Sequence, residues 1–324
     1  MSEPSDWSLP KRLQPQAGEI AFDLDAALAA IVTLKAEIPD DAFTAPILGS
    51  ERVGNGVVIR DDGLTLTVGY LITEAETIWI TAHDGSVVAG HALAYDFASG
   101  LGLVLPIGRL PTRAIARATA EPIDVGDTVI VAARGGRQHA LKARVFAKRV
   151  FAGYWEYVLD EALFTTPAHP EWSGAALLDL SGRVIGIGSL FVEEDVDGTS
   201  VQGNMFVPVD LLEPILESLL ATGRAPGPPR GWLGMYTAER EGQLVVDGVA
   251  ETGPAARAGV RPGDVVAKVA GERVGSLIEL FRCIWRQGPA GTTVPLTVSR
   301  GGRTLHLDVR SADRNDYLRK PRLQ

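Results

Sequence analysis

The sequence has very little cysteine and histidine. Its single cysteine, Cys283, excludes an intramolecular disulfide, so the fold must be held together by its hydrophobic core. Cys283 lies among apolar residues at helical spacing, and we expect it to be packed in that core. No window contains the roughly 18 consecutive apolar residues that a membrane-spanning helix needs. The sequence therefore predicts a globular protein without a membrane span.

The N-terminus also lacks the pattern of a secretory signal. Residues 1–18 are polar and contain prolines, without a basic cluster followed by an apolar run. We therefore expect a cytoplasmic protein. An incorrectly assigned start would instead leave room for an export signal and a periplasmic location.

Positive charge is scarce in most of the chain. Residues 1–223 carry 15 Lys and Arg against 30 Asp and Glu, whereas residues 224–324 carry 16 against 10, and the net charge is −9. The two parts are expected to attract each other weakly, although two independently solvated surfaces would show the same split. Because no basic face is interleaved with aromatic residues, nucleic acid is not an expected partner.

Short β-prone runs punctuated by Gly, Asp and Pro make up most of the first 160 residues. Such spacing predicts barrels or a sandwich rather than an α/β fold. The expected strands cover residues 30–38, 57–60, 64–68, 77–82, 87–95, 101–105, 128–133, 140–150 and 155–159. Helices are expected over 22–30 and 209–221, and a loop over 39–52.

A proline-rich segment divides the chain. Residues 223–230 contain three prolines and two glycines in eight residues, which is typical of a linker. We therefore predict the following organisation: a flexible leader (1–20), a first domain (21–222), the linker (223–230), a second domain (231–310) and a C-terminal tail (311–324).

The second domain carries a specific motif, which runs from Gly253-Pro254-Ala255-Ala256 to Gly259-Val260-Arg261-Pro262-Gly263-Asp264. Pro254 can start a short helix that Gly259 ends, and Ser276 can cap a helix that continues to Gln287. Two β-prone runs around 300–303 form a closing hairpin. This sequence resembles a PDZ domain of the type found in bacterial proteases.

The resemblance to PDZ domains implies a peptide-binding groove. In that family, a loop placed like Trp232, Leu233, Gly234 and Met235 donates backbone N–H groups to a terminal carboxylate, and the next strand pairs with the peptide. Leu280 and Ile284 of the following helix are expected at the same groove. The implied partners are peptides or protein C-termini with apolar ends. Alternatively, Trp232 and Met235 are core residues and Gly234 is a turn.

The first domain contains a serine in a recognisable setting. Ser173-Gly174 lies on a turn of small residues before an apolar strand, which folds back at Asp179 to Gly182. Together with Gly54-Asn55-Gly56-Val57-Val58-Ile59 and Gly182-Arg183-Val184-Ile185-Gly186-Ile187, it resembles the HtrA/Deg family of serine proteases over residues 22–310. The resemblance implies a mostly β protein: a chymotrypsin-like double β-barrel followed by a PDZ domain of α+β type. It also implies a homotrimer and a role in protein quality control.

The sequence departs from the family at the catalytic positions. Where the family has its catalytic histidine this sequence has Tyr70, and where the family has its aspartate it has Gly100. The family's Pro-Gly-Asn before the serine is replaced by Pro170-Glu171-Trp172, and the residues that follow Gly174 are altered to Ala175-Ala176. The loop that carries the backbone donors for an oxyanion is therefore altered as well.

These replacements favour an inactive protein. Tyrosine, with a pKa near 10, is a poor base at neutral pH, and loss of the base in a comparable triad costs on the order of 10⁶ in turnover. Ser173 is then a relic of the nucleophile position. We expect an HtrA-like pseudoprotease that binds peptides as an adaptor, chaperone-like or regulatory protein, without metal or cofactor. The alternative is a serine endopeptidase that uses Ser173 with a non-standard base such as His169.

Overall fold

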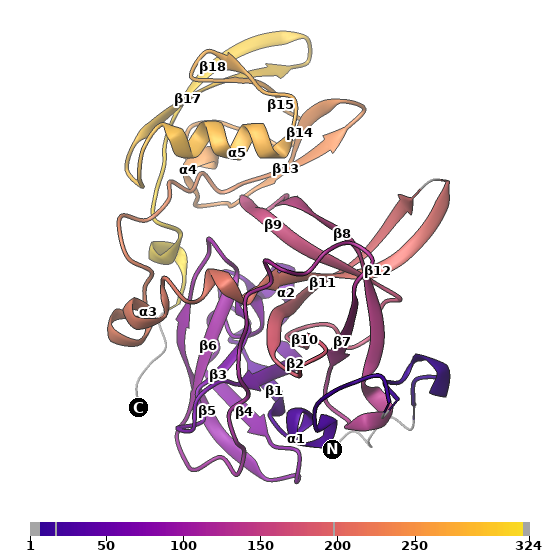
Figure 1. Cartoon of the computed structure of the whole chain (residues 1–324). Helices are drawn as coiled ribbons and strands as arrows, with labels where there is room; N and C mark the ends of the chain where they lie inside the picture. The colour runs from indigo at the N-terminus through magenta and orange to yellow at the C-terminus, as the bar shows by residue number, and fades with distance from the viewer. Residues whose placement is uncertain (1–6, 17, 197, 320–324) are drawn as a thin grey trace. The chain divides into compact units, whose positions relative to one another are not determined.

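The computed structural model describes residues 7–16, 18–196 and 198–319 and is mostly β (Figure 1). The chain forms two compact units. The first contains Met1–Arg149, Glu161–Pro226 and Arg319–Gln324, and the second contains Val150–Asp160 and Gly227–Leu318. The second unit thus combines the C-terminal part of the chain with a short segment from the middle of the sequence.

The first unit contains two closed barrels. In the first barrel the strand order is β1-β2-β3-β6-β5-β4. Its strands are β1 (Ile31–Glu37), β2 (Glu51–Val58), β3 (Thr65–Val68), β4 (Thr77–Thr81), β5 (Val87–Tyr95) and β6 (Leu101–Pro106). Val32, Leu34 and Ala36 alternate along β1 and are buried, as expected for a strand with one face on a core.

The second barrel has the strand order β10-β11-β12-β9-β8-β7. Its strands are β7 (Thr128–Ala132), β8 (Leu141–Gly153), β9 (Tyr157–Thr166), β10 (Ala176–Leu178), β11 (Val184–Val196) and β12 (Thr199–Pro208). The core includes Val131, Leu163 and Phe206, which are fully buried. The tip of the β8–β9 hairpin, residues 150–160, is the segment that belongs to the second unit.

The second unit is a sheet packed with one long helix. The strand order is β13-β14-β15-β17-β18, and β16 pairs with β15. Its strands are β13 (Met235–Arg240), β14 (Gln243–Val249), β15 (Val265–Val269), β16 (Glu272–Arg273), β17 (Thr293–Arg300) and β18 (Arg303–Arg310). The two closed barrels and this sheet confirm the predicted mostly β fold class.

The helices are short apart from one. They are α1 (Leu24–Leu28), α2 (Ala45–Leu48), α3 (Leu216–Thr222), α4 (Pro254–Arg257) and α5 (Leu277–Arg286), with 3₁₀ turns η1 (Lys11–Leu13), η2 (Gly69–Leu71), η3 (Arg137–His139), η4 (Val209–Leu211) and η5 (Arg314–Tyr317). The Ser276 side chain caps α5 by accepting from the Glu279 N–H. Cys283 is buried on this helix, which confirms its predicted packing role.

Several of the predicted elements are wrong in extent. The helix expected over 209–221 is split into η4 and α3, because Pro214 has no N–H to donate to the preceding turn. The loop expected over 39–52 contains α2 and the first residues of β2. Gly54-Asn55-Gly56, which leads into the expected strand over 57–60, lies inside β2, which ends at Val58. A Cβ at Gly54 would meet Leu71 Cδ1 at 2.5 Å, so the glycine serves close packing.

The leader predicted over residues 1–20 is only partly described. Residues 1–6 and 17 lie outside the described part of the chain. Within the rest, Leu9 is buried against the core of the second barrel, and its N–H donates to the Gln138 carbonyl at 3.0 Å. The described part of this segment is therefore anchored to the first unit.

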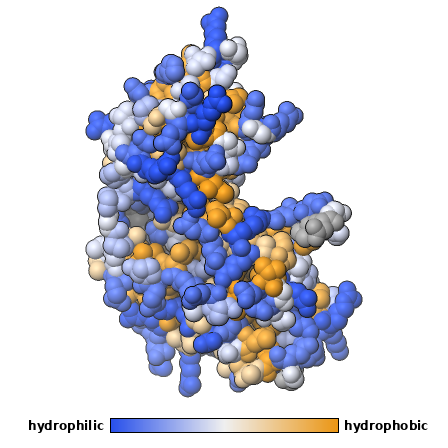
Figure 2. Space-filling view, turned by 45° about the horizontal axis from the view of Figure 1, so that its top comes forward, coloured by the Kyte–Doolittle hydropathy of each residue, from blue (hydrophilic) through white to orange (hydrophobic). Residues whose placement is uncertain are grey.

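No helix in the described part of the chain is long and apolar enough to cross a membrane. On the face shown in Figure 2, hydrophobic residues lie in small groups between hydrophilic ones. The large apolar side chains that are exposed, such as Val87, Ile107 and Val125, are scattered along the sequence. Scattered exposure of this kind is ordinary for a protein surface.

A buried histidine joins three segments of the second barrel. The fully buried ring of His169 donates from Nε2 to the His139 carbonyl at 2.7 Å and accepts the Glu171 N–H at Nδ1 at 3.0 Å. Its own N–H donates to Asn204 Oδ1 at 2.6 Å. Burial lowers the pKa of His169 below its usual value. The neutral ring is the form that satisfies both contacts, because an imidazolium has no acceptor for the Glu171 N–H.

We predict that His169 makes the barrels sensitive to acid. Below pH 6.5 the unfolded chain protonates this ring while the folded chain does not, so the free energy of unfolding should fall by up to about 1.4 kcal/mol for each pH unit. In His169→Gln this part of the fall should disappear. Guanidinium unfolding followed by circular dichroism at pH 7 and pH 5.5 measures the difference. His83→Gln, an exposed site, is the control, and equal acid sensitivity of the wild type and His169→Gln would contradict the prediction.

Candidate functional site

Ser173 lies on the loop between β9 and β10 and contacts a tyrosine. Its Oγ is 2.8 Å from the hydroxyl oxygen of Tyr70, on the turn η2 that follows β3. The Tyr70 hydroxyl is also 2.9 Å from the Ser189 carbonyl oxygen. Because a carbonyl only accepts, the single phenolic hydrogen goes to Ser189, and the Ser173 hydroxyl donates to Tyr70. The structure therefore brings the predicted residues Ser173 and Tyr70 together.

The chemistry of Tyr70 is that of a neutral phenol. Burial raises the pKa of Tyr70 to about 12, and this effect outweighs the contact with Ser173, which acts in the opposite direction. At neutral pH this phenol keeps its proton and donates it to the Ser189 carbonyl. It therefore cannot accept the proton of the serine. The contact thus orients the serine hydroxyl without activating it.

Gly100 contributes only backbone to this region. Its carbonyl accepts the N–H of Gly69, the residue before Tyr70, at 2.7 Å. Gly100 has a φ of +79°, a conformation that favours glycine. The carboxylate of the same turn, Asp96, accepts the Ser99 N–H at 2.7 Å and stabilises the turn itself. Gly100 is therefore close in space to the Tyr70 turn and offers no carboxylate to it.

The backbone N–H groups around Ser173 do not converge on one point. The Glu171 N–H donates to His169, and the Gly174 N–H donates to the Gly188 carbonyl at 2.8 Å. The Ser173 N–H has no acceptor among the residues that the structure describes. An oxyanion site needs at least two donors aimed at the same position. Here the Glu171 and Gly174 N–H groups donate to different protein acceptors, so neither is aimed at a position shared with the Ser173 N–H.

Asn55, which sequence reasoning had not identified as a site residue, fixes the serine loop. Its backbone N–H and its side-chain amide both donate to the Ser173 carbonyl, at 2.8 and 3.0 Å, and the amide also donates to the Glu171 carbonyl at 2.9 Å. Its Oδ1 accepts the Arg134 N–H at 2.8 Å. The Arg134 guanidinium in turn pairs with the Glu171 carboxylate at 2.9 Å. The only sign of this role in the sequence was the position of a polar residue between two glycines in a strand.

His169 is not placed as a base for Ser173. Both of its ring nitrogens are engaged, one with the His139 carbonyl and one with the Glu171 N–H. The ring is fully buried, so a proton from the serine would have no vacant nitrogen to reach. The histidine suggested by the sequence as a substitute base instead supports the loop.

In the second unit, the loop from Trp232 to Met235 holds a carboxylate. The N–H groups of Gly234 and Met235 donate to Glu156 Oε1 at 2.6 and 2.9 Å, and the Leu233 N–H donates to Oε2 at 2.9 Å. Gly234 has a φ of +72°, which turns its N–H toward the same point as its neighbours. Three N–H groups that converge on one carboxylate are what the PDZ resemblance implies for this loop.

The side chains expected at the peptide groove are buried. Leu233, Met235, Leu280 and Ile284 lie in one core cluster that also contains Val158, from the β8–β9 hairpin. Trp232 packs on Tyr317, with ring centroids 4.8 Å apart. All six predicted groove residues thus lie around one region of the second unit, with the hairpin tip, residues 150–160, as part of the same core.

Glu156 was missed by sequence reasoning. It lies in the turn between β8 and β9, nearly 80 residues from the loop that it contacts. Burial raises the pKa of Glu156 to about 7, while the N–H donors and Arg314 act in the opposite direction. An acidic residue in an aromatic-rich turn was the only sequence signal for it.

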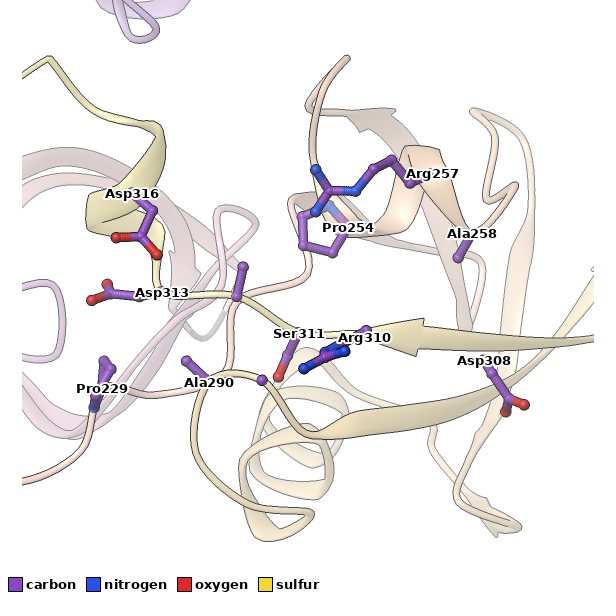
Figure 3. Close-up of a pocket in the computed structure, with 12 residues that line it drawn as sticks. Pro229, Pro254, Arg257, Ala258, Ala290, Asp308, Arg310, Ser311, Asp313 and Asp316 are labelled. Carbon is purple, nitrogen blue, oxygen red and sulfur yellow. The ribbon is translucent and has the colours of Figure 1, made fainter.

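A second concave region of about 640 Å³ lies elsewhere in the same unit (Figure 3). Arg257 and Pro254 of α4, Arg310 of β18 and Asp316 line it, and the Leu233–Met235 loop does not. Arg257 donates to the Thr252 carbonyl and to the Tyr317 hydroxyl, so its charge stabilises the loops around it. In the described part of the chain no three His, Cys, Asp or Glu side chains are grouped closely enough to bind a metal.

Two family models match the chain. A trypsin-like peptidase domain matches residues 54–187, which span both barrels, and a PDZ domain matches residues 231–310. Among curated proteins, the serine protease Do-like HtrA of Lactobacillus helveticus is 24% identical over 79% of this chain and 68% of its own length. The serine endoprotease DegS of Haemophilus influenzae is 25% identical over 80% of this chain and 76% of its own length.

Solved structures agree on the fold. The HtrA-type protease AlgW with decapeptide has a TM-score of 0.52 at 20% identity and covers 92% of this chain and 98% of its own. The serine endoprotease from Yersinia pestis has a TM-score of 0.53 at 23% identity and covers 91% and 99%. With the matched domains in this order and the two barrels followed by the sheet and helix of the second unit, this chain belongs to the HtrA-type family of trypsin-like peptidases with a C-terminal PDZ domain.

Proposed function

We propose that this protein is a catalytically inactive member of the HtrA-type family, which binds peptides or protein C-termini through its PDZ domain. The proposed inactivity rests on two contacts of the Tyr70 hydroxyl, which accepts from Ser173 and donates to the Ser189 carbonyl. A role as adaptor, chaperone-like binder or regulatory partner fits a protein that captures chains without cutting them.

The size of the catalytic loss supports inactivity. A serine nucleophile needs a base to remove its proton, and loss of the base in a comparable triad lowers turnover on the order of 10⁶-fold. The activity that survives such a loss comes from the oxyanion donors, and here the Glu171 N–H is committed to His169. Neither contribution is available to Ser173.

The arrangement of the PDZ domain supports peptide binding. The Leu233–Met235 N–H groups already hold one carboxylate, and β13 lies at the end of the sheet, where a peptide can pair with its backbone. Because the surrounding side chains of Leu280 and Ile284 are apolar, we expect the ligand to end in an apolar residue. A homotrimer formed through the barrels is the expected assembly, and native mass spectrometry measures it.

The reactivity of Ser173 can be tested directly. We expect a fluorophosphonate probe to leave the protein unlabelled, because the serine hydroxyl donates to a neutral phenol and no base can remove its proton. In-gel fluorescence measures labelling, with trypsin in the same reaction as the positive control. Labelling that disappears in Ser173→Ala would support the alternative, a serine endopeptidase with a non-standard base.

Restoring the histidine and the aspartate of the triad should not restore activity. We expect Tyr70→His combined with Gly100→Asp to cleave casein no faster than the wild type, because the Glu171 N–H stays engaged with His169. The variant should also be less stable, by about 1–2 kcal/mol from the positive φ that Asp at position 100 must adopt, and by a further amount from the loss of the Tyr70 contacts.

The matched control for that strain is Gly85→Asp, at an exposed turn with a φ of +84° and open space around it. It should lose only the part that comes from the positive φ, about 1–2 kcal/mol in thermal unfolding. Cleavage by the repaired variant that vanishes when Ser173→Ala is added would show that the donors around the serine are sufficient after all.

The chemistry of the peptide terminus should decide its affinity for the PDZ domain. A peptide with an apolar C-terminal residue and a free carboxylate should bind at least about 10-fold more tightly than the same peptide with a C-terminal amide, because the amide brings N–H groups against the three N–H donors of the loop. Fluorescence anisotropy measures both. A peptide that ends in Asp tests the preference for an apolar end. Equal affinity for acid and amide would count against the groove.

A further inference from the structure

The tip of the β8–β9 hairpin fills the carboxylate site of the PDZ domain. Both oxygens of Glu156 are used, one accepting from Gly234 and Met235 and the other from Leu233, at distances of 2.6 to 2.9 Å. Only 8% of Glu156 is exposed. The three N–H groups that a terminal carboxylate would need therefore already have an acceptor, and it comes from this chain.

The contacts of the tip continue along the groove. The Thr237 N–H of β13 donates to the Tyr154 carbonyl at 3.2 Å, which is a main-chain contact on the strand that would pair with a peptide. Val158 is buried in the same core cluster as Leu280 and Ile284 of α5. The tip thus contacts the carboxylate loop and β13, and Val158 shares a core with α5, the third element that would hold a ligand.

The backbone of the hairpin tip has an unfavourable conformation at Glu156. Glu156 has a φ of +62°, a conformation that residues other than glycine seldom adopt. A non-glycine residue persists there when the surrounding structure compensates for the strain. Arg314 adds to this by donating to the Trp155 carbonyl at 3.3 Å. The contacts of Glu156 with the loop supply the compensation, and they would be lost if the tip left the groove.

We propose that residues 154–158 are an internal ligand of the PDZ domain: the side-chain carboxylate of Glu156 replaces the C-terminal carboxylate of a peptide, so an external chain end binds only by displacing the hairpin tip. This inference rests on the proposed peptide-binding function and adds its regulation. The competitor is part of the same chain, so its effective concentration is fixed and does not fall on dilution.

The consequence is a lowered apparent affinity. When the competent, open state is a small fraction of the molecules, the apparent dissociation constant rises by the inverse of that fraction. A tip that is docked in about 90–99% of the molecules lowers the affinity for an external peptide by about 10- to 100-fold. The same arithmetic favours partners that offer more contacts than the tip does. The hairpin tip thus excludes C-terminal sequences that have low affinity for the PDZ domain.

The test compares two carboxylates of the same hairpin in the full chain. Glu156→Ala removes the acceptor from the PDZ loop, whereas Glu161→Ala removes an exposed carboxylate that pairs with Lys148. The probe is a fluorescein-labelled decapeptide with an apolar C-terminal residue and a free carboxylate, measured by anisotropy. We expect Glu156→Ala to bind it at least about 10-fold more tightly than the wild type, and Glu161→Ala to match the wild type.

The outcomes separate the two proposals. If Glu156→Ala binds the peptide no more tightly than the wild type, while both bind, the internal ligand is wrong and peptide binding stands. If neither protein binds, both proposals fail. If both variants bind more tightly to the same degree, a general loosening of the hairpin is the cause and the specific role of Glu156 is wrong.

A second measurement uses only the wild-type protein, in case Glu156→Ala does not fold. Hydrogen–deuterium exchange of residues 150–160 is followed with and without a saturating concentration of the same decapeptide. Displacement predicts faster exchange at the tip and slower exchange at 233–240 when the peptide is bound. Unchanged exchange at the tip alongside protection of 233–240 would overturn the proposal.

Discussion

Backbone N–H groups shielded from water need an acceptor. At two sites of this protein such groups find their acceptor in the chain itself. Beside Ser173, the Glu171 N–H donates to His169, and in the PDZ domain three N–H groups donate to Glu156. In an active protease or an open peptide receptor, such donors are kept for the substrate or ligand. Here the Glu171 N–H and the three N–H groups from Leu233 to Met235 already have an acceptor in the folded chain, and the properties proposed for both sites follow from that.

At the protease-like site, hydrogen bonds of Tyr70 and Asn55 hold the serine loop in place. Tyr70 links the first barrel to Ser173 and Ser189 of the second, and Asn55 ties the serine loop to β2 and to Arg134. These contacts are closely spaced and partly buried, so they stabilise one arrangement of the loop. A serine in such a network serves cohesion between the barrels. The fold of the family is retained around a serine hydroxyl that is bonded to a phenol.

At the PDZ site, the same constraint gives a different result, because the acceptor lies on a hairpin tip. Glu156 provides a side-chain carboxylate, which has the geometry of a chain end without being one. The contact is exchangeable in principle, since any other carboxylate can satisfy the same donors. In the proposed arrangement, Glu156 satisfies the three N–H donors when no external ligand is bound. An external ligand must then bind more tightly than the hairpin tip in order to replace it.

Local patterns in the sequence determined much of this protein. Alternation in β1, the Ser276 cap of α5 and the turn motif near Pro254 follow from neighbouring residues, and the absence of histidine at 70 and of a carboxylate at 100 can be read directly. Tertiary structure alone decided the rest. Tyr70 meets Ser173 across 103 positions and Glu156 meets Gly234 across 78, and such contacts leave no periodic trace in the sequence. They depend on where the closure of the barrels and the packing of the PDZ core place each backbone N–H, because hydrogen bonds form between groups that are near in space.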